Sequence, residues 1–230
     1  MLERLENSDN IVGMETAVNP CAIGNSEKIE ESIDRSKHDR LIRIARLAML
    51  IECEGSITIG MSPPTKTRNR PALYPTVDIT NTAMEIIDEA RETLIDERVG
   101  FSVKPQRYSG GFGKRLRHDL NIHSFDRTES VLNLILPFLR SKKRQAEIVL
   151  AFVASRRKAD PKSAYSEQEW RWTTEVRKLN GRQPSRKALD KARARLDSSD
   201  GSQSPRAIEY FTRYVAMCEE LQNVLEERDK

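Results

Sequence analysis

Two glutamates, Glu52 and Glu54, stand one residue apart where an apolar run ends in a glycine. Apolar side chains recur at helical spacing over residues 39–53, so the pattern predicts a helix that ends at Gly55. The C-terminal end of a helix is the negative end of its dipole, so carboxylates placed there need a compensating cation. Carboxylate oxygens suit Mg²⁺, which makes a metal site one interpretation. The alternative is that both are exposed helix-end residues whose energetic cost is small.

Other catalytic patterns are missing from the sequence. It contains no HExxH, no CxxC and no arrangement of Ser, His and Asp typical of nucleophilic catalysis. The three cysteines are far apart, without metal-like spacing, and indicate a reducing compartment. No Lys-Ser/Thr helix start follows the glycines at 110–113, so they predict a hairpin turn and not a phosphate-binding loop.

Charge is distributed unevenly along the 230 residues. Residues 1–37 hold four Lys/Arg and eight Asp/Glu, whereas residues 101–160 hold thirteen Lys/Arg and five Asp/Glu. The basic segment favours a polyanion as partner, with nucleic acid the leading candidate and an ordinary solvated surface the alternative. No apolar run reaches the length of a membrane span, so no membrane partner is expected. The acidic N-terminus predicts a protein of the cytoplasm, or of the organelle that encodes it, and not a secreted one.

Hydrophobic periodicity predicts the element order helix, strand, strand, helix, strand, strand, helix, followed by further helices. Two antiparallel hairpins with helices on one face define an α+β fold whose sheet has a second, polar face. The expected helices are 39–53, 83–96, 127–139 (with Asp126 as N-cap), 142–155, 166–179, 184–196 and 206–228, and the expected strands are 56–61, 74–81, 99–108 and 114–124.

Composition predicts three segments. Residues 1–37 are polar and acidic and are expected to form a poorly ordered leader, with a short helix at 26–36. Residues 38–160 form the α+β core, and residues 161–230 form a helical C-terminal extension.

The stretch LAMLIECEGSI, residues 47–57, resembles the signature of the LAGLIDADG homing endonuclease family. That signature runs apolar–Ala–Gly–apolar–apolar–acid–small–acid–Gly–Ser. Three further segments resemble the family in the same order: VDITNT (77–82), LNLILPFLRSKKRQAEIVLAF (132–152) and YSEQEWRWTTEVRKLNGRQPSRKALDKARARLD (165–197). The resemblance covers about residues 39–197 and is to the single-motif, homodimeric members. It implies an α-β-β-α-β-β-α fold with an antiparallel, saddle-shaped sheet, here with extra C-terminal helices.

The resemblance also implies a function. It points to a site-specific double-strand DNA endonuclease that hydrolyses phosphodiesters with Mg²⁺ as a homodimer on a long pseudo-palindromic target. Mn²⁺ and Ca²⁺ are alternative occupants of the metal site, and intron homing is the expected context. The expected partners are double-stranded DNA and a second copy of the chain, with no small-molecule substrate.

The family's catalytic residues map onto a few positions of this sequence. Glu54 of each subunit is expected to bind metal, helped by the backbone carbonyl of Cys53, while Glu52 has a structural role near the helix end. Asn81 matches the amide that orients the attacking water. Lys142 matches the lysine that stabilises charge at the scissile phosphate, with Lys143 as the alternative.

Basic and polar side chains of the two hairpins are the candidates for contacting DNA bases and phosphates. They are Lys66, Arg68, Arg70, Lys104, Arg107, Lys114, Arg115, Arg117, Asn121 and His123.

The expected dimer interface is Ala45, Ala48, Met49 and Glu52. Met49 departs from the family, which has a glycine there that lets two motif helices approach closely. The alternative function is therefore a cleavage-deficient nucleic-acid-binding protein of the same fold, either an intron RNA maturase or a DNA-binding regulator.

Overall fold

The computed structural model describes residues 23–63, 72–107, 116–160, 163–181, 186–197 and 204–228. The chain divides into one unit that ends at Leu41 and a second that runs from Ile42 to Lys230, and helix α1 (Ile23–Glu54) crosses the boundary. Helix α1 thus includes residues 23–37, the segment for which the sequence predicts a leader with a short helix at 26–36, and residues 1–22 lie outside the described ranges. No helix within these ranges is long and apolar enough to span a bilayer.

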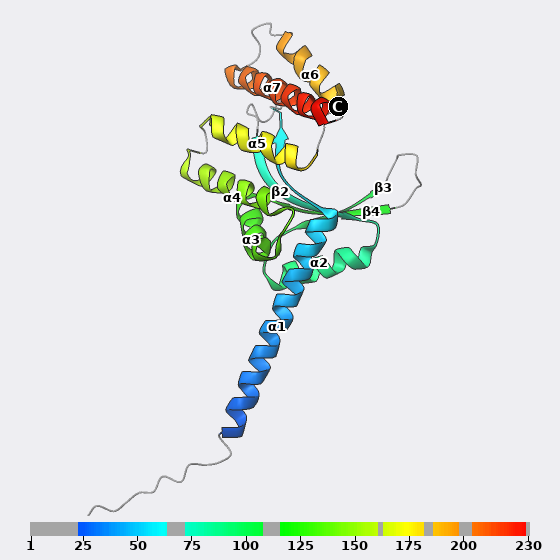
Figure 1. Ribbon diagram of the computed structural model, residues 1–230, viewed down its shortest axis with the longest axis vertical. Coiled ribbons are helices and arrows are strands. Elements are labelled where there is room, and N and C mark those ends of the chain that lie inside the picture. The colour runs from blue at the N-terminus through cyan, green and yellow to red at the C-terminus, as the bar shows by residue number, and fades with distance from the viewer. Residues whose placement is uncertain are drawn as a thin grey trace, which may run out of the picture. The chain divides into compact units, whose positions relative to one another are not determined.

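Four strands form one antiparallel sheet in the order β1-β2-β4-β3. Helices α2, α3 and α4 pack against the strands, as Figure 1 shows. This element order confirms the α+β class and the α-β-β-α-β-β-α sequence of the core. The bounds are β1 Gly55–Ser62, β2 Ala72–Asn81, α2 Met84–Asp96, β3 Ser102–Arg107, β4 Leu116–His123, α3 Phe125–Ile135 and α4 Lys143–Lys158.

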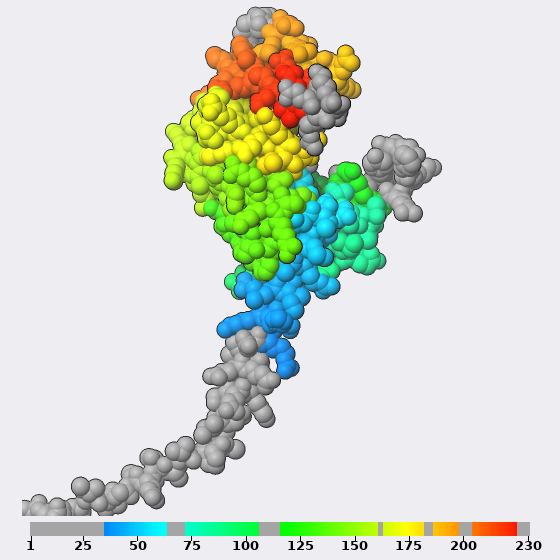
Figure 2. All heavy atoms as spheres, in the orientation of Figure 1, coloured from blue at the N-terminus to red at the C-terminus, as the bar shows by residue number. Residues whose placement is uncertain are grey.

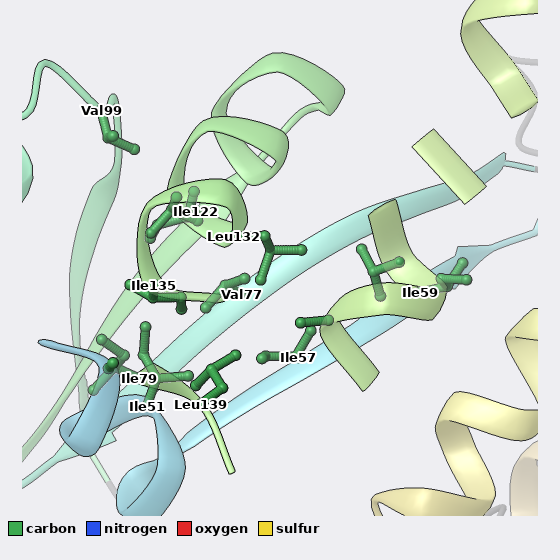
Figure 3. Packing of buried hydrophobic residues seen from close by; sticks show 14 of the residues in the cluster. Ile51, Ile57, Ile59, Val77, Ile79, Val99, Ile122, Leu132, Ile135 and Leu139 are labelled. Carbon is green, nitrogen blue, oxygen red and sulfur yellow. The ribbon is translucent and has the colours of Figure 1, made fainter. Parts of the chain in front are cut away.

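The core joins the end of α1 to the sheet and to α3. Ile51 of α1 is fully buried in the same cluster as Ile57, Ile79 and Ile135 (Figure 3). Each such side chain contributes about 1.5–3 kcal/mol on leaving water. The last turn of α1 is therefore anchored by Ile51, directly before Glu52 and Glu54.

Helix α3 begins earlier than the sequence predicts. Its N-cap is Ser124, whose hydroxyl accepts the N–H of Arg127 at 3.4 Å, so the prediction that Asp126 caps the helix is wrong. Asp126 already lies in the first turn and pairs with Arg157 across 2.7 Å. The helix ends at Ile135, and Pro137 lies in the 3₁₀ turn Leu136–Phe138 that follows.

Three C-terminal helices follow: α5 (Glu167–Leu179), α6 (Arg186–Asp197) and α7 (Pro205–Arg228). Helix α7 contacts both of the others, and in Figure 2 all three form one continuous body. Trp170 of α5 packs against Tyr210 of α7, while Leu189 of α6 packs against Met217 in a separate small cluster. Asn180, just after α5, donates from Nδ2 to the Ile57 carbonyl of edge strand β1 at 2.8 Å.

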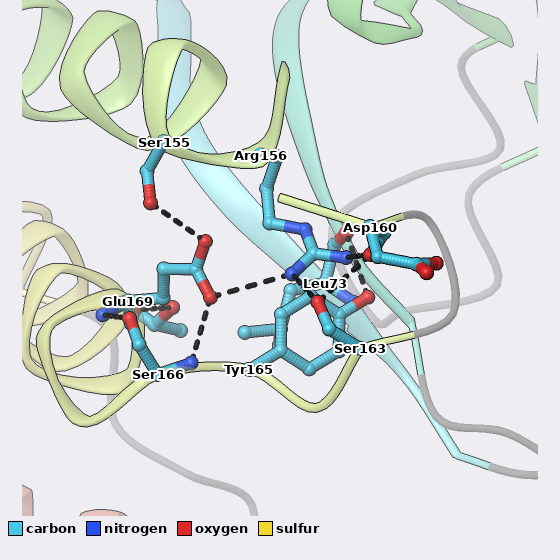
Figure 4. A network of polar contacts seen from close by, with 9 residues as sticks. Leu73, Ser155, Arg156, Asp160, Ser163, Tyr165, Ser166 and Glu169 are labelled. Carbon is cyan, nitrogen blue, oxygen red and sulfur yellow. Dashed lines mark hydrogen bonds and ion pairs between the residues drawn. The ribbon is translucent and has the colours of Figure 1, made fainter. Parts of the chain in front are cut away.

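A buried polar network joins the end of α4 to the start of α5 (Figure 4). Glu169, which is 1% exposed, accepts from the Ser155 hydroxyl at 2.9 Å and from the Ser166 N–H at 2.8 Å. Arg156 lies 3.6 Å from the same carboxylate and 4.7 Å above the centre of the Tyr165 ring. The Tyr165 hydroxyl accepts the N–H of Leu73, which ties this network to β2.

Candidate active site and nucleic-acid interface

The carboxylate of Glu52 binds the segment that precedes α4. It accepts the N–H groups of Arg140, Ser141 and Lys142 at 2.9–3.1 Å, and the Ser141 hydroxyl at 2.7 Å. Burial acts to raise the pKa of Glu52, but the Ser141 hydroxyl and the three N–H groups outweigh it and lower the pKa to about 2. Glu52 therefore stays ionised and holds α1 to the start of α4, a structural contact.

The ammonium of Lys142, just before α4, in turn binds backbone carbonyls at the end of α1. Its Nζ donates to the carbonyl oxygens of Ile51, Glu52 and Gly55, each at 2.7 Å. An ammonium has three donors, so all three are used. Burial lowers the pKa of Lys142 below its usual range, against the raising effect of the carboxylates of Glu52 and Glu54.

This geometry corrects the role that we assigned to Lys142. With all three donors bound to carbonyl oxygens, Lys142 holds the negative end of the α1 dipole and has no donor left for a phosphate. It supplies the compensating cation that carboxylates at a helix end require. Lys143 is exposed, and none of the described residues binds it, so Lys143 is the lysine that remains available to a substrate.

Glu54 and Cys53 lie exposed at the end of α1. The Cys53 carbonyl, which is next to the Glu52 carbonyl in the chain, is not an acceptor for Lys142. Within the described ranges, no three His, Cys, Asp or Glu side chains gather as metal ligands. The exposed Glu54 carboxylate and the backbone carbonyl of Cys53 are hard oxygen donors, which fit Mg²⁺ in type.

Asn81 ends β2 with a fixed side chain. Its Oδ1 accepts the N–H of Ala83 at 2.9 Å, at the start of α2. That bond orients the amide, and Nδ2 has no partner among the described residues. Asn81 thus presents a free N–H donor at the strand end.

Alternation along β2, β3 and β4 defines a polar face of the sheet, opposite the buried Val77, Ile79 and Leu120. Two of the side chains on this face, Lys104 and His123, are exposed, whereas Arg117 is paired with Asp119 at 3.3 Å. The polar face consists of Thr76, Asp78, Thr80, Lys104, Arg117, Asp119, Asn121 and His123.

Sequence reasoning missed half of the polar face. Thr76, Asp78 and Thr80 alternate with the apolar Val77 and Ile79, so the period-two pattern could have found them. Asp119 was missed because only basic and amide residues were sought, yet it accepts the Thr80 hydroxyl at 3.0 Å.

The structure brings only part of the expected DNA-contacting set together. The polar face includes Lys104, Arg117, Asn121 and His123. Arg107 lies three residues after Lys104 on β3, opposite Leu116 of β4, so its position in the strand alternation is that of the other face. The others, Lys66, Arg68, Arg70, Lys114 and Arg115, lie outside the described residues.

The α1 surface expected at the dimer interface is partly available. Met49 is 66% exposed and lines a groove with Cys53 of α1 and Ile86 of α2. Ala45 is half-buried, but Ala48 is completely buried inside the protomer and offers nothing to a partner. Ala48 is therefore removed from the expected interface, and Glu52 is engaged within its own chain.

No family model and no curated protein match this sequence. Solved structures do match: the homing endonuclease I-CvuI in complex with its target is 16% identical, covering 80% of this chain and 98% of that chain with a TM-score of 0.45. The group I intron-encoded homing endonuclease I-CeuI, complexed with DNA, is 13% identical, covering 90% and 100% with a TM-score of 0.42. The LAGLIDADG homing endonuclease I-GzeII with its DNA target is 11% identical, covering 71% and 51% with a TM-score of 0.44. Each of these three solved structures is of a homing endonuclease.

Proposed function

We propose that the protein is a site-specific double-strand DNA endonuclease that acts as a homodimer with Mg²⁺. The observation that carries the proposal is Glu54, an exposed carboxylate at a helix end that Glu52 and Lys142 hold in place. Such a carboxylate beside a polar sheet face supports hydrolysis of a phosphodiester lying along that face. The resemblance of residues 47–57 to the LAGLIDADG signature supports the same function.

The oxygen donors at the end of α1 support a shared metal site. Mg²⁺ is usually held by one or two carboxylates together with water and substrate phosphate, and we infer that a two-fold axis brings Glu54 of a second copy to the site as the second carboxylate. Two close carboxylates repel each other unless a cation lies between them. Bound Mg²⁺ would favour ionisation of a water ligand and stabilise the leaving oxygen. The Asn81 Nδ2 donor would orient the attacking water. Lys143, which follows Lys142 in the chain and has no partner among the described residues, would bind the phosphate.

The polar face is proposed to read DNA in the major groove. At about 3.3 Å per residue, a seven-residue strand spans roughly 23 Å, or about seven base pairs. Lys104 and Arg117 would bind phosphate or guanine, while Asn121 would suit adenine. The basic residues of the two hairpin loops, Lys66, Arg68, Arg70, Lys114 and Arg115, would extend this contact, and binding should weaken steeply with salt.

A second candidate function is nucleic-acid binding without cleavage, and Met49 is the observation that favours it. Its side chain is 66% exposed on the α1 surface that would meet a partner, where the family has glycine. A methionine on both copies would hold the helices further apart and separate the two Glu54 groups. The protein would then act as an intron RNA maturase or a DNA-binding regulator.

One experiment separates the two functions. A plasmid library with randomised inserts is incubated with the protein in Mg²⁺, Ca²⁺ or EDTA, and both bound and cut DNA are sequenced. An endonuclease should bind one sequence in Mg²⁺ and in Ca²⁺ but cut it only in Mg²⁺. Sequence-specific binding in both ions without cutting would instead support the binding protein.

The Glu54→Gln variant is the first prediction. It should retain DNA binding but cut about 10³-fold more slowly, because the amide cannot supply the carboxylate charge. Glu92→Gln is the matched control, since Glu92 is exposed on α2 and has no partner among the described residues. Undiminished cutting by Glu54→Gln would remove Glu54 from the mechanism.

A further inference from the structure

A chain of three side chains on the polar face fixes one histidine. The Thr76 hydroxyl oxygen lies 3.0 Å from Asp78 Oδ1 and 2.9 Å from His123 Nδ1. Thr76 and His123 are direct partners across β2 and β4, and Asp78 is two residues further along β2 on the same face. Thr76 is 3% exposed, whereas His123 is exposed, so the chain runs from beneath the face to its surface.

The hydrogen atoms in this chain can be assigned from its chemistry. An ionised carboxylate only accepts hydrogen bonds, so the single hydroxyl hydrogen of Thr76 must go to Asp78. The Thr76 oxygen then accepts from His123, which requires a hydrogen on Nδ1. In neutral imidazole the other nitrogen carries a lone pair, so Nε2 is an acceptor. No described residue donates to Nε2, and Tyr74 packs only ring against ring, 6.3 Å between centroids.

We propose that His123 is a specificity-determining residue that selects a base bearing an amino group, through an Nε2 acceptor set by Thr76 and Asp78. This rests on the proposed function, in which the polar face enters the major groove. Adenine and cytosine present amino donors there, whereas guanine and thymine present acceptors to the same position. A histidine free to adopt either tautomer would accept or donate and would discriminate poorly.

The test combines a tautomer measurement with a binding selection. Long-range ¹H–¹⁵N NMR at pH 8 reports which imidazole nitrogen of His123 carries hydrogen, with His123→Ala giving the assignment. In parallel, the wild type, Thr76→Val and His123→Ala select binding sites from randomised duplexes in Ca²⁺. Thr58→Val is the matched control: Thr58 lies opposite Thr76, is 2% exposed, and its hydroxyl has no partner among the described residues.

The expected result is an Nδ1–H tautomer and one position per half-site that favours adenine or cytosine about tenfold. Thr76→Val and His123→Ala should lose that preference alone, and Thr58→Val should keep it. An Nε2–H tautomer, or unchanged selection by both variants, would overturn this inference while leaving the proposed function intact. If the wild type selected no DNA sequence at all, the proposed function would fall, and this inference with it.

Discussion

At the scale of single residues, Glu52 and Lys142 form a reciprocal cap. The carboxylate of Glu52 accepts three N–H groups from the start of the α4 segment, and the ammonium of Lys142 donates to three carbonyls at the end of α1. Each charged group satisfies backbone groups that a helix end leaves unpaired. These bonds fix the end of α1 against the segment before α4, two residues before Glu54.

Removing either half of this cap should destabilise the fold. We expect Glu52→Gln to lower the free energy of unfolding by about 1–2 kcal/mol at pH 7, after allowing for solvent screening. Because the pKa of Glu52 is lowered to about 2, its contribution is complete above pH 4.5 and is lost as pH falls towards 2. The gap between wild type and variant should therefore close over that range in metal-free urea titrations.

Lys142→Met should lower the free energy of unfolding by a similar amount at pH 7. Its control, Lys143→Met, should leave the free energy of unfolding unchanged. A constant gap between wild type and Glu52→Gln from pH 7 to pH 2 would contradict the assigned hydrogen bonds.

At the scale of elements, the Arg156–Glu169 network holds α4, α5 and β2 together. The Arg156 side chain is 9% exposed and the Glu169 side chain 2% exposed, so both charges are removed from water. A buried charge that loses its partner is strongly destabilising, because its desolvation is no longer offset. This pair therefore helps to hold the start of α5 against the end of α4.

We expect Arg156→Met to lower the free energy of unfolding by about 3 kcal/mol, measured by urea denaturation. The double variant Arg156→Met/Glu169→Gln should recover part of the loss, because the amide removes the unpaired charge. Arg171→Met is the control, since Arg171 is 72% exposed and pairs with Glu167 only at 3.7 Å. Equal losses in the single and double variants would rule out an electrostatic origin.

The order of these elements could be predicted from sequence, because hydrophobic spacing and turn residues are local signals. The strands at 56–61 and 74–81 and the helix at 83–96 match β1, β2 and α2 closely. What failed depended on tertiary contacts: Lys142 was matched to a phosphate because its carbonyl acceptors lie about ninety positions earlier in the chain.

The site could be predicted to the same extent. The sequence places Glu54 at a helix end and Lys104 and His123 on strands, where the structure also has them, and their roles in cleavage and DNA binding stay predictions. The Thr76–His123 contact needs the β2–β4 register, which no local pattern specifies. Ala48 was misassigned because sequence alone does not say which stripe of α1 packs against its own sheet.

At the scale of the whole molecule, we propose that two copies of the chain together form the active site. The exposed groove of Met49, Cys53 and Ile86 lies on the α1 surface that carries Glu54 at its end. A partner seated there would bring two copies of Glu54 together.

Met49→Glu should prevent this association, because each of the two copies would then carry a negative charge at the contact and the two charges would repel each other. We expect the dissociation constant of the dimer to rise at least tenfold, about 1.4 kcal/mol, in sedimentation equilibrium. Ile95→Glu is the control, as Ile95 is 59% exposed on α2 but does not line the groove. A dimer that survives Met49→Glu but not Ile95→Glu would place the interface elsewhere.

The most direct measurement is cleavage by mixed dimers. Wild-type and Glu54→Gln chains are refolded together at varied ratios, and the total number of cut strands of a selected target, single-strand nicks included, is measured in Mg²⁺. If each site needs Glu54 from both copies, activity should follow the square of the wild-type fraction. Activity that falls in simple proportion to the wild-type fraction would mean that one chain suffices, and would contradict the shared site.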